Sequence, residues 1–206
     1  MLAQLRTAVV MIIVLTVLSG LAYPLAMTGL AQVIFPHQAD GSLIERDGRV
    51  IGSALLGQSF VDLDTGRTLP GYFRGRPSAA GSLADGTIVS SGSNLGPTNQ
   101  ALVDRVEADV AVVRKENNLP AAALVPVDLV TASASGVDPH ISPAAAQLQV
   151  ARVARERGLS EEQVRDLVKA STEGRTLGFM GESRVQVLKL NLALDSLVPL
   201  LATPAS

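Results

Sequence analysis

The chain has 206 residues, of which 47% are hydrophobic and only 17% are charged, and its formal net charge is −2. Such a chain is too apolar for disorder, and it has no basic excess with which to neutralise the phosphates of a nucleic-acid partner. It contains no cysteine, which excludes a disulfide framework, a cysteine-ligated zinc site and a thiol nucleophile.

An uncharged stretch covers residues 7–36, near the N-terminus. About 20 apolar residues in a helix span a hydrocarbon core of roughly 30 Å. We therefore expect an N-terminal membrane anchor over residues 1–36, with a transmembrane helix at about residues 8–30. Pro24 is expected to bend or end this helix, and Tyr23 suits an interfacial position. The anchor residues are Val9, Val10, Ile12, Ile13, Leu15, Leu18, Tyr23 and Pro24.

Two other interpretations of this stretch stay open: a signal peptide cleaved near residues 20–22, and a buried helix of a soluble core. The apolar region of a signal peptide usually has about 7–15 residues, fewer than this stretch. The flank before the stretch carries Arg6 and no acid, whereas the flank after it mixes both signs. The positive-inside rule then predicts a cytoplasmic N-terminus and a soluble, exocytoplasmic domain over residues 37–206.

The soluble part is predicted to be a mixed domain of helices and strands, so the fold class is α+β. Short apolar segments between glycine-containing turns predict a strand or hairpin arm over residues 50–58, and residues 125–131 are rich in strand formers. Residues 63–71 and 74–100 have the composition of loops. Residues 184–198 alternate like a strand but also have a helical apolar face, and their good helix formers favour a helix.

Three further helices are predicted from apolar spacing and capping residues. Apolar residues at helical spacing indicate an amphipathic helix from about residue 98 to residue 117. The serine–proline pair at residues 142–143 starts a second helix, which ends at a Gly158 C-cap. A capping box opens a third helix over residues 160–170. The arginine-rich end of the second helix, residues 152–157, is expected to be a solvated charged face.

No catalytic or nucleotide-binding motif occurs in the sequence. Each of the three lysines lacks the Ser or Thr that follows the lysine of a phosphate-binding loop. The two histidines, His37 and His140, are too far apart in the sequence to form a metal-ligand pair on one helix. We therefore expect the chain to bind no cofactor and no metal through a recognisable motif.

One turn-rich connection contains the side chains of a nucleophile, an orienting acid and a base, namely Ser133, Ser135, Asp138 and His140. Ala134 stands where the nucleophile elbow of a hydrolase needs a glycine. A structured turn, in which Asp138 binds local amides, is the simpler interpretation, and a partner-contact surface is another. The polar loop at residues 91–99 is either an adaptable contact or ion-facing loop, or a loop that leads into the start of a helix. The possible partner contacts are Ser93, Asn94, Ser135, Asp138, Pro139 and His140.

Several sequence motifs follow one another along the chain: LAYPL (21–25), FPHQADGSLI (35–44), GSALLGQSF (52–60), YFRGRPSAA (72–80), SGSNLGPTN (91–99), PVDLVTASASGVDPHISPAAA (126–146), QVARVARERGL (149–159) and RTLGFMGESRVQVLKLNLALDSL (175–197). With these motifs the chain resembles the C subunit of the bacterial Kdp potassium-transporting ATPase over nearly its whole length. Three positions depart from the usual family pattern: Ala134 replaces Gly, Val137 replaces Leu and Gln186 replaces Asn.

The resemblance implies a non-catalytic, single-span accessory subunit of a four-chain complex in the inner membrane. The other chains would be a channel-like potassium-binding subunit, a P-type ATPase subunit that hydrolyses ATP, and a small stabilising subunit. ATP and potassium would therefore be bound at the level of the complex.

The resemblance also implies a catalytic chaperone that raises the ATP affinity of the ATPase subunit. Because ATP is cytoplasmic, a domain outside the membrane could raise that affinity only by conformational coupling. A membrane-anchored exocytoplasmic hydrolase and a binding domain are the alternative functions.

Overall fold

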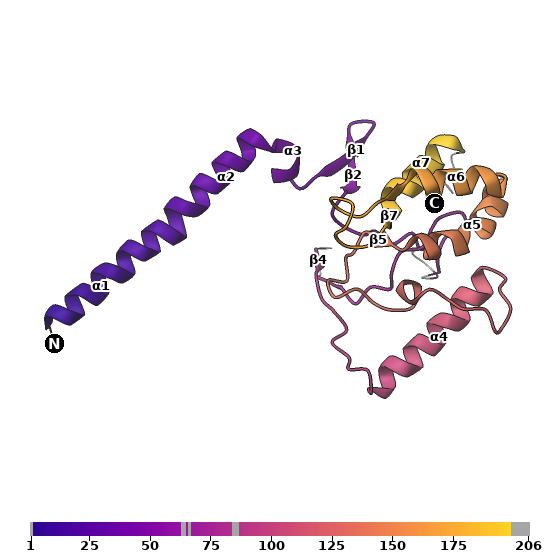
Figure 1. Cartoon of the computed structure of the whole chain (residues 1–206), viewed down its shortest axis with the longest axis horizontal. Helices are drawn as coiled ribbons and strands as arrows, with labels where there is room; N and C mark the ends of the chain where they lie inside the picture. The colour runs from indigo at the N-terminus through magenta and orange to yellow at the C-terminus, as the bar shows by residue number, and fades with distance from the viewer. Residues whose placement is uncertain (1, 63–64, 66, 84–86, 199–206) are drawn as a thin grey trace. The chain divides into compact units, whose positions relative to one another are not determined.

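A computed structural model of the chain describes residues 2–62, 65, 67–83 and 87–198. The chain divides into two compact units, Met1–Ser53 and Ala54–Ser206. The first unit contains the long apolar helix and a hairpin, and the second contains helices and small antiparallel sheets, in keeping with the predicted α+β class (Figure 1). The boundary between the two units lies between residues 53 and 54, whereas the sequence predicted a domain that begins at residue 37.

The first unit begins with one continuous helical rod, made of α1 (Leu2–Val17), a π-helical turn (Leu18–Ala22) and α2 (Tyr23–Ile34). It is long and apolar enough to cross a membrane, and none of its described side chains is buried. Pro24 does not end the helix. The amide of Tyr23 donates to the carbonyl of Leu18, five residues back, and this wider turn makes room for the proline ring within the helix.

A short helix, α3 (Pro36–Ala39), and an antiparallel hairpin of β1 (Leu43–Arg46) and β2 (Arg49–Ser53) complete the first unit. Asp47 and Gly48 join the strands with φ of 53° and 74°, the left-handed pair that suits the twist of a two-residue hairpin turn. The strand predicted over residues 50–58 therefore ends at Ser53, whose hydroxyl donates to the carbonyl of Gly41 at 2.7 Å.

The second unit contains two small antiparallel sheets and four α-helices among the residues that the structure describes. β3 (Gly81–Ser82) pairs with β4 (Ile88–Val89), and β7 (Arg184–Gln186) lies between β5 (His140–Ile141) and β6 (Thr172–Glu173). The helices are α4 (Gln100–Glu116), α5 (Pro143–Arg157), α6 (Glu161–Ala170) and α7 (Val187–Leu197). Residues 63, 64 and 66 of the loop predicted at 63–71, and residues 84–86 of the loop predicted at 74–100, lie outside the described residues.

The predicted helix ends are confirmed by their caps. The Ser142 hydroxyl accepts from the amide of Ala145, and Gly158 closes the same helix with φ of 65°. Ser160 and Gln163 form the expected capping box of α6. These contacts satisfy amides and carbonyls that a helix leaves unpaired at its ends.

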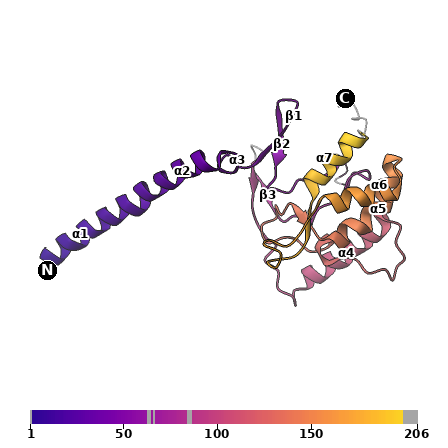
Figure 2. The ribbon, with the colours of Figure 1, turned by 45° about the horizontal axis from the view of Figure 1, so that its top comes forward.

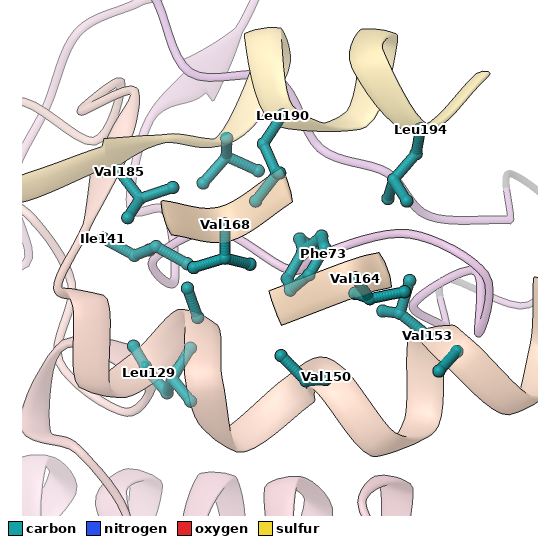
Figure 3. Close-up of a cluster of buried hydrophobic side chains, with 14 of the residues drawn as sticks. Phe73, Leu129, Ile141, Val150, Val153, Val164, Val168, Val185, Leu190 and Leu194 are labelled. Atoms are coloured by element: carbon teal, nitrogen blue, oxygen red, sulfur yellow. The ribbon is translucent and has the colours of Figure 1, made fainter. Parts of the chain in front are cut away.

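The core lies where α5, α6 and α7 meet around Phe73, which is 0% exposed (Figure 3). Valines reach it from α5 and α6, and leucines from α7. Transfer of each such side chain from water into the core stabilises the folded unit by about 1.5–3 kcal/mol. The labelled members are Phe73, Leu129, Ile141, Val150, Val153, Val164, Val168, Val185, Leu190 and Leu194.

The strand predicted over residues 125–131 is wrong. Its centre is a 3-10 helix, Val127–Leu129, which begins after Pro126. Pro126 has no amide to donate to a ladder, and Asp128 is used elsewhere, because its carboxylate accepts from the amide and the hydroxyl of Ser142 at 2.6 and 3.1 Å. These constraints prevail over the β propensity of the valines.

Residues 184–198 contain both structures that their sequence allowed, because β7 passes directly into α7. Gln186 is the boundary. Its side chain accepts from the amide of Lys189 at 2.5 Å and so caps the new helix.

The solvated charged face predicted for residues 152–157 is wrong for two of its four charged residues, because Arg152 and Arg157 are only 3% and 5% exposed, whereas Arg155 and Glu156 are exposed as predicted. Arg152 donates to the carbonyls of Pro70 and Tyr72, and Arg157 donates to that of Gly71 at 2.6 Å. A guanidinium has five N–H donors, enough to satisfy loop carbonyls that have no partner in a sheet or helix. Burial lowers the pKa of Arg152 to about 10, so the group stays protonated at neutral pH.

Candidate functional site

The connections that the sequence marked as possible contact loops meet on one side of the second unit. The carbonyl of Ser135 accepts from the amide of Ser91 at 3.0 Å and from the hydroxyl of Ser90 at 2.8 Å. The hydroxyl of Ser78 donates to the carbonyl of Gly136 at 2.6 Å. We call this assembly, residues 57–59, 75–82, 88–92 and 131–140, the loop layer.

Glycines allow the backbones of the loop layer to approach closely. Gly136 has φ of 71°, and a Cβ there would lie 2.5 Å from the carbonyl oxygen of Ser91 and 2.7 Å from the amide nitrogen of Ala80. A Cβ on Gly57 would lie 2.6 Å from the carbonyl oxygen of Asp138. The layer is therefore packed backbone against backbone, which leaves no room for side chains at these points.

Arg76 is the central side chain of the loop layer. Its Nη1 lies 3.1 Å from Oδ2 of Asp138, while its Nε and Nη2 donate to the carbonyl of Thr131 at 3.3 Å. Nη2 also donates to the carbonyl of Ala132 at 3.3 Å. One planar guanidinium thus fixes the start and the end of the same connection, a geometry that lysine could not reproduce.

Asp138 binds the turn in addition to binding Arg76. Its Oδ1 accepts from the amide of His140 at 3.0 Å and lies 3.4 Å from Nδ1 of the same histidine. Asp138, His140 and Arg76 are each between 26% and 30% exposed at the side chain, so they form a polar cluster that a partner could reach. Pro139 is buried, and its carbonyl accepts from the amide of Val187 at 3.0 Å.

The serines and His140 do not form a nucleophile–base pair. The Ser135 hydroxyl accepts from the amide of Val137 at 3.2 Å and lies 3.5 Å from that of Ser133. Among the described residues no hydrogen bond joins Ser135 to His140, whereas a nucleophile and its base are about 2.6–3.2 Å apart. The structured turn therefore describes this segment better than a hydrolase site does.

Ser93 and Asn94 follow the contact with Ser135 along the chain. Asn94 is exposed and has φ of 51°, and Ser93 is half-buried. In the part of the chain that the structure describes, neither side chain makes a hydrogen bond to the turn at residues 133–140. The structure thus joins residues 90–92 to this turn and leaves Ser93 and Asn94 at its margin.

Two hollows in the surface share the Arg76–Asp138 pair in their lining. The first, of about 470 Å³, is lined by Gly57, Ile88 and Val187 together with the pair. The second, of about 460 Å³, is lined by His140 and Asp128 together with the same pair. Over the described residues there is no group of three or more histidines and carboxylates that could hold a metal ion.

A second polar cluster, which the sequence reasoning missed, lies beside the core. Arg157 stacks over the ring of Tyr72 at 4.5 Å and pairs with Asp195 at 2.9 Å, and Tyr72 stacks on Phe60 at 4.9 Å. Burial and the carboxylate of Asp195 raise the pKa of Tyr72. Helical spacing was the available signal, because Arg157 lies on the same face of α5 as Val150 and Val153.

The family model described as KdpC, K+-transporting ATPase, c chain, matches residues 5–196. The chain belongs to this family. It is 59% identical to the potassium-transporting ATPase KdpC subunit of Polaromonas naphthalenivorans (strain CJ2), over 95% of each chain. It is also 59% identical to the KdpC subunit of Rhodopseudomonas palustris (strain BisB5), over 95% of this chain and 98% of the relative.

The resemblance seen in the sequence motifs is thereby confirmed. The match spans the apolar helix, the loop layer and the α5–α7 core alike. The apolar helix is consistent with a single-pass membrane anchor of an ATPase subunit. As a c chain, this protein has the other subunits of the ATPase as its partners.

Proposed function

We propose that this chain is a non-catalytic accessory subunit, anchored by residues 2–34, that works on the outside of the inner membrane. The observation that carries the proposal is the family match, which covers the anchor and the domain together. The polar loop layer supports it, because the Ser135 hydroxyl accepts from the amide of Val137 and the His140 ring lies against Asp138, and among the described residues no hydrogen bond joins Ser135 to His140.

The orientation rests on charge. Arg6 is the only charged side chain before the uncharged stretch at residues 7–36, whereas Asp40, Glu45 and Arg46 follow the stretch with mixed sign. By the positive-inside rule the N-terminus is cytoplasmic, and the second unit is exocytoplasmic. The lipid bilayer is thus a partner of the chain along its anchor.

The protein partners are a channel-like potassium-binding subunit, a P-type ATPase subunit and a small stabilising subunit. Potassium and ATP are bound by those chains and not by this one. The exposed part of the loop layer, around Asp138 and His140, is the contact surface. A surface already fixed by Arg76 and by glycine contacts loses little conformational entropy when a partner docks on it.

The chaperone effect follows from linkage. Suppose that one conformation of the membrane subunits binds both this domain and ATP more tightly. Binding of the domain then raises the ATP affinity, and bound ATP raises the affinity for the domain by the same factor. Coupling of about 1–3 kcal/mol corresponds to roughly 5–150-fold in ATP affinity. No contact between this chain and the nucleotide is needed.

The orientation is tested with single cysteines, for which the cysteine-free parent chain is the blank. One variant is Ala3→Cys and the other is Lys169→Cys, an exposed position on α6. A membrane-impermeant maleimide applied to whole cells should label only the second variant. Labelling of the first variant alone would place the domain in the cytoplasm and make direct contact with ATP the better mechanism.

The accessory role is tested on the purified complex with and without this chain. We expect loss of potassium-stimulated ATP hydrolysis without it, a weaker ATP affinity in whatever activity remains, and no hydrolysis by the isolated chain. Unchanged potassium-stimulated hydrolysis in its absence would contradict the proposal.

A further inference from the structure

The connection between β6 and β7 carries three exposed apolar side chains. Leu177, Phe179 and Met180 are 78%, 70% and 52% exposed. The connection is drawn in gold and points away from the α5–α6 helix pair in both views (Figures 1 and 2). We call residues 175–182 the apolar tip.

The apolar tip is ordered by its own hydrogen bonds. Thr176 and Met180 exchange two backbone bonds of 2.9 Å, and the amides of Gly178 and Phe179 donate to carbonyls within the tip at 3.0 and 3.3 Å. At the base, Nη2 of Arg175 contacts both carboxylate oxygens of Glu182 at 2.8 and 3.0 Å. The tip therefore needs no partner to become ordered, and its two charges cancel.

Folding alone does not account for the leucine at position 177. Its φ is 55°, in the left-handed region, where a bulky L-residue is disfavoured and Asn or Gly is preferred. It also exposes most of its side chain to water. A residue that is unfavourable in both respects indicates that the apolar side chain serves a contact outside the domain.

We infer that the apolar tip inserts into the interfacial region of the lipid bilayer that holds the anchor. This inference rests on the anchoring proposed above. The anchor helix ends at Ile34 and the second unit begins at Ala54, so a short connection keeps the domain at the membrane at high effective concentration.

Two properties favour a bilayer over a protein groove as the occupant. Four amides of the tip, those of Thr176, Gly178, Phe179 and Met180, are already bonded within it, so these four donors need no water when the loop enters the bilayer interface. For the same reason these amides cannot pair with a strand of another protein. A neutral, convex, apolar tip needs no complementary pocket in a fluid bilayer.

The test uses the full chain, which contains no tryptophan. Phe179→Trp places a single indole at the tip. The chain is reconstituted in phosphatidylcholine vesicles with and without lipid brominated in the upper acyl chain, which quenches indole on contact. We expect the brominated vesicles to lower the emission by about twofold or more.

Two matched variants control the measurement. Tyr23→Trp reports insertion of the anchor itself and should be quenched. Leu124→Trp, at a position that is 92% exposed after α4, should not be quenched. Leu177→Asn, added to Phe179→Trp, suits the left-handed backbone and should reduce the quenching while the far-UV circular dichroism stays unchanged.

The outcomes separate this inference from the proposed anchoring. Quenching of the Tyr23→Trp variant without quenching of the Phe179→Trp variant overturns the apolar tip alone, whereas no quenching of either overturns both. Equal quenching of the Leu124→Trp and Phe179→Trp variants also overturns the inference. The inference is likewise overturned if the emission of the Phe179→Trp variant changes only when the other ATPase subunits are present. That result would assign the tip to a protein contact.

Discussion

The α5–α7 core and the loop layer belong to the same compact unit but are held together by different forces. Around Phe73 the helices bury valines and leucines against one another. In the loop layer the contacts are backbone hydrogen bonds, glycine approaches and the fork of Arg76. The core should therefore set the stability of the unit, and the layer should set the shape of its surface.

The largest expected effect comes from Phe73→Ala. Phe73 is fully buried among the three helices, so its truncation leaves a cavity that destabilises the unit by about 3–5 kcal/mol. Urea unfolding of the full chain in detergent, followed by circular dichroism, measures this loss. Phe179→Ala is the matched control, since Phe179 is 70% exposed and its change should stay within about 0.5 kcal/mol. Equal losses would mean that Phe73 is not central to the core.

The next effect tests the polar cluster beside the core. Asp195→Ala leaves the buried guanidinium of Arg157 without its carboxylate, 2.9 Å away, which destabilises the unit by about 3 kcal/mol or more. Asp166→Ala, at an exposed position on α6, is the control and should have little effect. If the double variant Arg157→Met, Asp195→Ala is as unstable as Asp195→Ala alone, the unpaired charge is not the cause.

A smaller and more local effect is expected from Gly136→Ala. The backbone at this position has a left-handed φ, and the carbonyl of Ser91 would lie 2.5 Å from the new Cβ. The loops must therefore move apart, which lowers the free energy of unfolding by about 1–3 kcal/mol. Hydrogen exchange should accelerate at the amide of Ser91, which donates to Ser135, and stay slow in α5 and α6. Gly174→Ala is the control, because a Cβ there would have nothing within 4 Å. Faster exchange throughout the unit would show that layer and core unfold together.

The same contrast explains what could be predicted from the sequence. The ends of α5 and α6 depend on residues close in the chain, such as Ser142 and Gly158, and so capping rules located them. The apolar helix was recognised from composition alone. The helix extends at both ends beyond the predicted spanning segment, from Leu2 to Ile34. The π-helical turn at Leu18–Ala22 that accommodates Pro24 was not foreseen.

Contacts between distant residues were not accessible to local reasoning. Arg157 was assigned to a solvated face, although its partners include Gly71 and Asp195. The segment at residues 125–131 was assigned to a strand, although Asp128 binds Ser142. In the candidate site, the turn at Asp138 was foreseen, but the role of Arg76 was not, because its partners are more than 50 residues away in the sequence.

Arg76→Lys is expected to have the smallest effect on stability and a clear effect on function. The Arg76 side chain is 26% exposed, so its pairing with Asp138 contributes about 1 kcal/mol or less. Lysine keeps the charge but cannot reach Asp138 and the carbonyls of Thr131 and Ala132 together. The turn that presents His140 should then lose its fixed shape, while unfolding by urea stays nearly unchanged.

A loosened surface loses conformational entropy when it becomes ordered on a partner subunit. This cost weakens docking of the domain and therefore the coupling between docking and ATP binding. We therefore expect an ATP affinity for the Arg76→Lys complex that lies between those of the intact complex and of the complex lacking this chain. Arg155→Lys, at an exposed arginine of α5, is the control and should leave the affinity unchanged. An intact ATP affinity for Arg76→Lys, with the chain still bound, would mean that the shape of the loop layer does not transmit the effect.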